Sequence, residues 1–289
     1  MFVSGFTFVR NAVKYDYPFV ESIRSLLPLV DELIVCLGNS SDDTASLLSE
    51  INDSKIKIVP SVWDDSLREG GRVLAVETDK AFHAVSPSAD WCIYLQADEV
   101  IHEEDIPVIR KAMKDALPDK KIEGLLFNYI HFYGSYSYVG SSRRWYRHEI
   151  RIVRNDKRIH SYRDAQGFRL DGRMLNVKKI DARIFHYGWV KSPVLQREKQ
   201  LNFHKLWHPD EKVDKMVKDA PYDYSGIDLL KKFKGTHPEV MASRVKAQDW
   251  ELDFDTSANN LSVKNRVLHR IENLTGYRLF EYRNYKIIK

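Results

Sequence analysis

From Phe2 to Leu117 the chain alternates short apolar runs with segments whose apolar residues recur at helical spacing, and this alternation constrains the fold most strongly. The apolar runs are Phe2 to Val9, Glu32 to Leu37, Ile56 to Val62 and Trp91 to Leu95. The helical segments follow each run in turn, over 17–27, 40–51, 71–85 and 104–117. Strands and helices that alternate through short connections predict a parallel sheet with helices on both faces. Trp91 to Leu95 lacks polar alternation, as expected of a strand buried on both sides.

The pattern changes after Leu117. Strands are predicted over 123–132, 149–154 and 177–190, and from Ser192 onward the apolar spacing is helical. Ser262 is typical of a helix start and Gly276 of a helix stop. We therefore expect an α/β domain over residues 1–190 and a helical C-terminal extension over residues 191–289.

Composition narrows the class of protein. Hydrophobic residues make up 43% of the chain and charged residues 30%, as in ordinary globular proteins, and a net charge of +4 does not by itself indicate nucleic-acid binding. Cys36 and Cys92 lie in apolar strand-like runs, which predicts buried free thiols and a reducing compartment. No signal-peptide pattern and no apolar run of about 20 residues is present, so we expect a cytoplasmic protein.

Two carboxylates directly follow the run that ends at Leu95. Asp98 and Glu99 lie where a parallel strand would end, and open α/β sheets bind ligands beyond the carboxyl ends of their strands. Carboxylate oxygens there suit a hard cation such as Mg²⁺ or Mn²⁺, which would in turn hold a diphosphate. The alternative is that both residues only begin a surface loop.

Three motifs in order resemble the family 2 glycosyltransferases, which have the GT-A fold. Arg10-Asn11 ends the first strand, Ser40-Ser41-Asp42-Asp43-Thr44 is similar to the family's "GSTDGT" turn, and Leu95-Gln96-Ala97-Asp98-Glu99 is similar to the "LDADE" form of its DxD motif. The resemblance implies a Rossmann-like, mixed and mainly parallel sheet. It implies a nucleotide-sugar half over 1–105 and, more loosely, an acceptor half over 106–190.

The resemblance also implies a donor site. Arg10, Asn11, Asp42, Gln96 and Asp98 match its donor-binding positions, with Asp98 as ligand of Mn²⁺ or Mg²⁺. His186 would complete the metal shell, although a histidine in an aromatic run is also a common packing residue. Gln96 stands where the family has Asp, and an uncharged amide lowers the expected cation affinity. Leu37-Gly38 replaces the acidic pair that contacts the base in the family.

The residues after the third strand offer further donor contacts. Asp65, or its neighbour Asp64, would contact base or ribose, and Arg72 or Arg68 would meet a phosphate at a helix N-terminus beside two glycines. A solvated helix start accounts for the same residues.

A carboxylate on the acceptor side would take the proton of the attacking hydroxyl. Asp164 lies where the family places its acceptor-side loop and is the first candidate for this base, with Glu149 second. The alternative is that Asp164 pairs with Arg163 or Arg169 on the surface.

Aromatic and arginine residues crowd together between Tyr129 and Arg147. Aromatic faces stack on sugars and guanidinium groups bind anions, which suits an anionic glycan acceptor. The predicted acceptor contacts are Tyr133, Arg143, Arg144 and Trp145. The same mixture could bind single-stranded nucleic acid, which no recognisable motif supports, or form a structural patch capped by arginines.

The tail from Lys264 to Lys289 is basic, and its helical part carries an apolar stripe. Such a helix either lies on an anionic membrane surface, at the inner face where a lipid-linked acceptor would be found, or packs on its own domain.

The resemblance implies an inverting, nucleotide-sugar-dependent hexosyltransferase acting on a glycan or lipid-linked acceptor. The resemblance implies bacterial lipopolysaccharide or capsule synthesis as the setting. The alternatives are a non-catalytic nucleotide- or glycan-binding protein of the same fold and a nucleic-acid-binding module, of which we favour neither.

Overall fold

The computed structural model describes residues 1–67, 69–208, 210–257 and 260–288. Arg68 and Lys289, both named above, lie outside these ranges. The helices are α1 (Phe19–Leu26), α2 (Thr44–Ser49), α3 (Arg72–His83), α4 (Ile106–Ala116), α5 (Pro193–Lys205), α6 (Asp210–Met216), α7 (Ala242–Lys246) and α8 (Val263–Thr275). Short 3₁₀ turns occur at Leu27–Leu29, Glu69–Gly71, Glu103–Asp105, Tyr224–Gly226 and Glu239–Met241. No helix in the described ranges has both the length and the apolar character needed to cross a bilayer.

The first four strands pair in parallel, as the alternation predicts. They are β1 (Val3–Val9), β2 (Glu32–Gly38), β3 (Ile56–Ser61) and β4 (Trp91–Tyr94), in the spatial order β3-β2-β1-β4. Because successive parallel strands need a crossover, α1, α2 and α3 connect them. The four strands and four helices predicted up to Leu117 are therefore confirmed.

The sheet continues beyond β4 with mixed pairing. β8 (His148–Arg154) lies antiparallel between β4 and β6 (Gly124–Tyr133), and β7 (Ser135–Gly140) and β13 (Leu230–Lys232) follow. The long strand β12 (Asn176–Trp189) runs parallel to β6 and pairs with β5 (Glu99–Ile101) and β14 (Lys286–Ile287). A separate small sheet contains β9 (Ile159–Tyr162), β10 (Gly167–Leu170) and β11 (Arg173–Met174).

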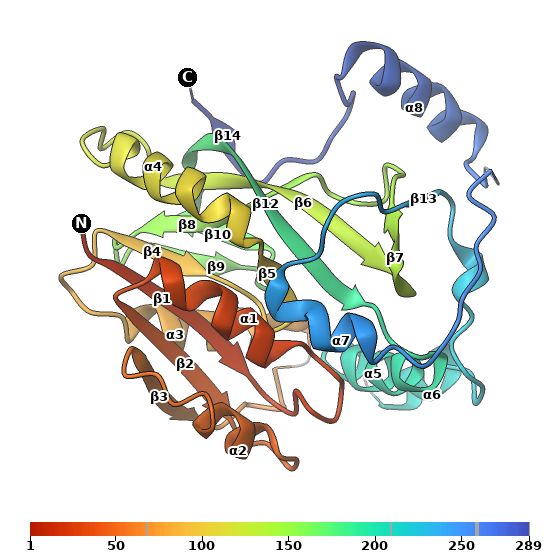
Figure 1. Cartoon of the computed structure of the whole chain (residues 1–289), viewed down its shortest axis with the longest axis horizontal. Helices are drawn as coiled ribbons and strands as arrows, with labels where there is room; N and C mark the ends of the chain where they lie inside the picture. The colour runs from red at the N-terminus through yellow and green to blue at the C-terminus, as the bar shows by residue number, and fades with distance from the viewer. Residues whose placement is uncertain (68, 209, 258–259, 289) are drawn as a thin grey trace.

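Helices cover both faces of the large sheet. α1 and α4 lie on one face and enclose an apolar core, while α3 packs on β1 and β2 from the other face, next to the small sheet (Figure 1). Trp91 and Tyr94 are fully buried, which explains why their strand shows no polar alternation. Cys36 and Cys92 are buried free thiols, as predicted. The predicted α/β class with helices on both faces is thus confirmed.

The C-terminal extension is helical and also returns to the sheet. β13 pairs with β7, and β14 pairs with β12. α8 begins after Ser262, whose side chain accepts a hydrogen bond from the Asn265 N–H, and ends at Gly276 with a left-handed φ of 69°. Both helix limits are confirmed, whereas the division into domains at residue 190 stays a prediction.

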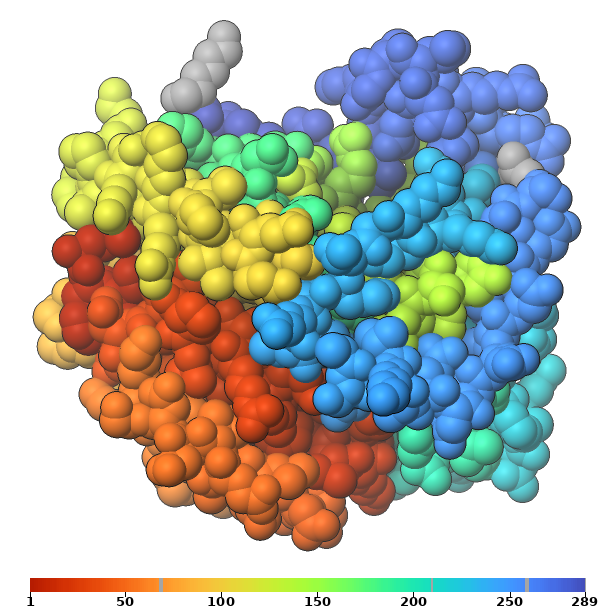
Figure 2. All heavy atoms as spheres, viewed as in Figure 1, coloured from red at the N-terminus to blue at the C-terminus, as the bar shows by residue number. Residues whose placement is uncertain are grey.

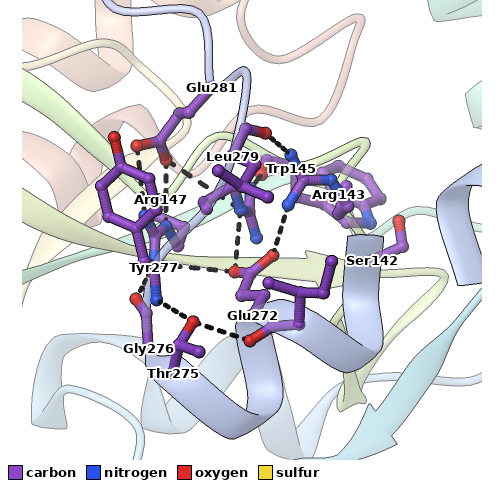
Figure 3. A network of polar contacts seen from close by, with 12 residues as sticks. Ser142, Arg143, Trp145, Arg147, Glu272, Thr275, Gly276, Tyr277, Leu279 and Glu281 are labelled. Carbon is purple, nitrogen blue, oxygen red and sulfur yellow. Dashed lines mark hydrogen bonds and ion pairs between the residues drawn. The ribbon is translucent and has the colours of Figure 1, made fainter. Parts of the chain in front are cut away.

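Ion pairs hold α8 to the rest of the molecule. The Glu272 carboxylate accepts hydrogen bonds from Arg143 at 2.9 Å and from Arg278 at 2.8 Å, and Arg147 pairs with Glu281 at 3.0 Å (Figure 3). No residue of α8 is fully buried, and in Figure 2 the helix forms a blue lobe at the edge of the molecule. Its attachment is therefore polar rather than apolar.

Candidate active site

The long strand β12 brings its C-terminal half beside the loop that follows β4. β5 pairs antiparallel with β12, with Glu99 opposite His186, and the Tyr187 N–H donates to the Asp98 carbonyl at 2.8 Å. As a result His186 Nε2 lies 3.6 Å from Asp98 Oδ2, and both side chains are about seven-eighths buried. The pair proposed from the sequence is thus brought together, by a contact across 88 residues of sequence.

Glu99 is committed to a structural ion pair. Its carboxylate accepts two hydrogen bonds from Arg151, at 2.8 and 2.7 Å, and one from the Tyr129 hydroxyl at 2.8 Å. Glu99 and Arg151 are both buried. For Glu99 the expectation of either a cation ligand or the start of a surface loop is therefore wrong, because the side chain is enclosed and paired.

Gly188 makes room for the Asp98 carboxylate. A Cβ at position 188 would overlap Asp98 Oδ2 and lie 2.9 Å from His186 Cε1. The Asp98 carboxylate can therefore occupy its position only because residue 188 has no side chain.

Two imidazoles connect the Tyr146 carbonyl with Asp98. His131 Nε2 lies 2.8 Å from the Tyr146 carbonyl, which can only accept, so this nitrogen carries the proton. Burial lowers the pKa of His131 well below its usual value, which favours the neutral ring. His131 Nδ1 lies 3.4 Å from His186 Nδ1, and His186 Nε2 faces Asp98. Burial also lowers the pKa of His186, against the opposing effect of Asp98.

Two lysines that the sequence did not single out lie beside this pair. Lys199 Nζ lies 4.0 Å from Asp98 Oδ2 and donates to the Gly188 carbonyl. Lys191 is fully buried and its Nζ donates to the Asp16 carbonyl at 2.6 Å. Burial lowers the pKa of Lys191 to about 7, with Lys199 acting in the same direction. Burial favours the neutral form of Asp98, but His186, Lys199 and Lys191 together hold its pKa below the usual value.

The side chains around Asp98 do not fit a resident divalent cation. Glu99 is paired with Arg151, Gln96 is an uncharged amide, and the Lys199 ammonium already faces the Asp98 oxygen that would bind the metal. No group of three or more His, Cys, Asp or Glu side chains within the described ranges could hold a metal ion. We therefore assign no chemical step to a metal.

A cavity of about 300 Å³ opens in front of Asp98, between the ends of β1 and β4 and helix α5. Five of the seven predicted donor-binding residues line it, namely Arg10, Asn11, Asp65, Gln96 and Asp98. Arg10 donates to the Asp65 carboxylate at 2.8 Å, and its guanidinium lies 5.2 Å from the centre of the Trp63 ring.

The two other donor-binding candidates lie elsewhere. The Asp42 carboxylate accepts hydrogen bonds from the Lys14 N–H at 2.7 Å and from the Thr44 hydroxyl at 2.6 Å, so it ties the turn before α2 to the loop after β1. Arg72 is exposed at the start of α3 and lines a separate hollow together with Asp164.

A second cavity, of about 210 Å³, contains both candidates for the base. Glu149, Asp164, Gln166 and Gln96 are among its lining residues, and Gln96 also lines the first cavity. Burial raises the pKa of Glu149 to about 7, although Arg151 opposes the shift, and burial likewise raises the pKa of Asp164. Gln96 therefore lines both cavities, and the second one contains carboxyl groups whose pKa values are raised.

None of the four predicted acceptor contacts lines either cavity. Tyr133 is buried and its hydroxyl donates to the Tyr224 carbonyl at 3.3 Å. Arg143 is paired with Glu272 (Figure 3). Trp145 packs against Tyr133 and Trp189, and Arg144 is exposed. These residues build the structural aromatic patch that the sequence left open as an alternative, and an acceptor role for them stays a prediction.

Comparison with known proteins gives partial structural matches only. No family model matches the chain, and no curated protein matches it. Glucosyl-3-phosphoglycerate synthase from Mycobacterium tuberculosis, in complex with Mn²⁺, uridine diphosphate and phosphoglyceric acid, matches with 21% identity over 45% of this chain and 43% of its own, at a TM-score of 0.31. S. aureus TarS matches with 12% identity over 75% of this chain and 42% of its own, at a TM-score of 0.39.

A third match is 4-diphosphocytidyl-2C-methyl-D-erythritol synthase from Anaerococcus prevotii DSM 20548, with 12% identity over 53% of this chain and 70% of its own, at a TM-score of 0.34. The chain thus spans less than half the length of the first two proteins. Matches this partial decide neither family nor activity, so the proposals below rest on the residues of this chain.

Proposed function

We propose that this protein is a glycosyltransferase of GT-A type that transfers a sugar from a nucleoside-diphosphate donor to a glycan or lipid-linked acceptor. The observation that carries the proposal is the pair of cavities that share Gln96 as a lining residue. One lies beyond the carboxyl ends of β1 and β4, where α/β sheets bind nucleotides. The other presents carboxyl groups whose pKa is raised, as a base for a hydroxyl requires.

In this proposal the acceptor hydroxyl attacks the anomeric carbon in a single, inverting displacement. Its proton passes to a carboxylate in the second cavity, and the bond to the diphosphate breaks. Asp164 is the proposed base because it is partly exposed within the cavity. Glu149 is nearly enclosed, and one of its oxygens accepts the Ile150 N–H at 3.0 Å, which makes it the second choice.

The test is calorimetric titration with a panel of nucleoside-diphosphate sugars, each with and without Mn²⁺. Saturable binding of one donor, weakened by Asp98→Ala, supports the proposal and identifies the sugar. The Mn²⁺ arm tests the metal dependence predicted from the family resemblance. No binding of any donor under either condition contradicts the proposal.

The second candidate is a non-catalytic nucleotide- or glycan-binding protein with the same fold. Gln96 favours it, because an amide replaces the first carboxylate of the family motif. Gln96→Asp separates the two: a gain in Mn²⁺ affinity without hydrolysis or transfer of the bound donor favours the binding protein.

We further propose that α8 contacts an anionic membrane, in keeping with the setting implied by the resemblance, bacterial cell-surface polysaccharide synthesis at the inner face of the membrane. Val263, Val267, Leu274 and Phe280 are 77%, 51%, 86% and 88% exposed, and basic residues flank them. Because Asn284 of the tail bonds the Gln166 carbonyl beside the second cavity, point variants are better than truncation. Leu274→Ser with Phe280→Ser should reduce binding to anionic vesicles, whereas Val62→Ser, on another exposed apolar residue, should not.

A further inference from the structure

The strongest unexplained feature of the candidate site is the charge around Asp98. Asp98 Oδ2 faces His186 Nε2 at 3.6 Å, and both side chains are about seven-eighths buried. A carboxylate in a buried place requires a cation or a proton beside it. The cation that this chain supplies is Lys199, 4.0 Å from the same carboxylate oxygen.

The contact with Asp98 does not exhaust the hydrogen-bond donors of the Lys199 ammonium. An ammonium group has three N–H donors, of which one goes to the Gly188 carbonyl, and 4.0 Å to Asp98 is longer than a direct hydrogen bond. The charge also lies 5.1 Å from the centre of the Tyr17 ring, one of the residues lining the donor cavity. Donor capacity therefore remains for an anion at this point.

Helix α5 places this lysine next to the donor cavity. Asn202 and Phe203 of α5 line the cavity, as does Leu206 directly after the helix, and residues three and four positions apart lie on one helix face. Lys199 precedes Asn202 by three positions and Phe203 by four, so it lies on the same face. It does not itself line the cavity, but its ammonium lies beside Asp98 and Tyr17, which do. Its side chain is 12% exposed, which reduces competition from water.

Nearby carboxylates do not cancel this charge. Glu99 is neutralised by Arg151, Asp98 acts on Lys199, and both Asp16 and Asp98 act on Lys191. A divalent cation would add charge to a site that already holds one buried ammonium against one carboxylate, with a second ammonium behind it.

We infer that Lys199 binds the diphosphate of the donor and stabilises it as the leaving group, in the role that a divalent cation would otherwise have. The inference rests on the proposed glycosyl transfer. As the anomeric carbon–oxygen bond breaks, its electron pair goes to the diphosphate oxygen, while the acceptor oxygen bonds the same carbon and gives its proton to the base. Asp98 and the Gly188 carbonyl hold the Lys199 ammonium in place. The ammonium offsets the negative charge that develops on the diphosphate.

The experiment measures binding of inorganic pyrophosphate by calorimetry in EDTA and then with Mn²⁺. The wild-type protein should bind pyrophosphate in EDTA, and Lys199→Met should bind it about 10- to 100-fold more weakly, the range for losing a charge-assisted hydrogen bond. Lys199→Arg should keep most of the affinity, which excludes misfolding as the cause. Lys215→Met, an exposed lysine of α6, is the matched control and should bind as the wild type does.

Two results would overturn the inference. One is equal binding by Lys199→Met and wild type in EDTA, and the other is pyrophosphate binding that requires Mn²⁺. The donor panel separates this failure from failure of the proposed function. A nucleoside-diphosphate sugar that binds only with Mn²⁺ refutes the role of Lys199 and leaves the transferase in place, whereas no donor binding at all refutes the transferase.

Discussion

Ionised Glu149, buried beside the second cavity, lowers the free energy of unfolding. It is 6% exposed, and burial raises the pKa of its carboxyl group from 4.5 to about 7. An acid with a raised pKa in the folded protein binds its proton more tightly folded than unfolded. Stability is therefore lost as pH rises from about 4.5 through about 7, and the full penalty is present above that range.

The magnitude follows from the shift. Each pKa unit corresponds to about 1.4 kcal/mol, so ionised Glu149 lowers the free energy of unfolding by about 3 kcal/mol at pH 8. At pH 5 the carboxyl group is protonated in the folded protein, and the penalty falls to about 1 kcal/mol. Glu149→Gln removes the ionisation and keeps an oxygen that can accept the Ile150 N–H.

Urea denaturation of wild type and Glu149→Gln at pH 5 and pH 8 measures this difference. The stability of the variant relative to wild type should increase by about 2 to 3 kcal/mol between the two pH values. Glu211→Gln, on an exposed glutamate of α6, is the control and should show a pH dependence close to that of the wild type. A constant difference between wild type and Glu149→Gln from pH 5 to pH 8 would refute the raised pKa and, with it, the main reason to consider Glu149 as a base.

Three further substitutions test the site. Arg151→Met should lower the free energy of unfolding by about 3 to 5 kcal/mol, because it leaves the buried Glu99 charge unpaired. Adding Glu99→Gln should recover part of this loss, as measured by urea denaturation. A double variant that is no more stable than Arg151→Met would contradict this cause. Gly188→Ala should displace Asp98 and reduce kcat/KM roughly 100-fold with little change in Tm, and unchanged kinetics would show that the carboxylate position does not matter. Asp164→Asn should reduce kcat by about 10²- to 10⁴-fold with donor affinity nearly unchanged in calorimetry, and normal turnover would place the base elsewhere.

The parts of the fold that sequence predicts are those decided by local periodicity. The unbroken apolar run from Trp91 to Tyr94 is long enough for a strand and too short for a helix, and it is buried on both faces as predicted. Ser262 and Gly276 mark the ends of α8 through their own side-chain and backbone preferences. The position of Asp98 beyond the end of β4 was predictable, because the carboxyl end of a parallel strand has a fixed place in the sheet whichever residues surround it.

The charge around Asp98 was not predictable, because distant segments determine it. Glu99 follows Asp98 directly and has the same chemistry, yet it faces Arg151 of β8 and is neutralised there. His186 reaches Asp98 through the antiparallel pairing of β12 with β5, and Lys199 reaches it through α5, whose sequence shows only a charged helix. Nothing local to Lys199 distinguishes it from the exposed Lys205 six positions later.

The same reasoning applies to the aromatic and arginine residues between Tyr129 and Arg147, whose acceptor role stays a prediction. Stacking rings and guanidinium groups have the chemistry of a glycan site, but whether they are available depends on what packs against them. Here Glu272 of α8 and Glu281 after it, more than 120 residues away, satisfy Arg143 and Arg147. The type of a side chain determines which ligands it could bind. Its contacts in the folded protein determine whether it is available to bind them.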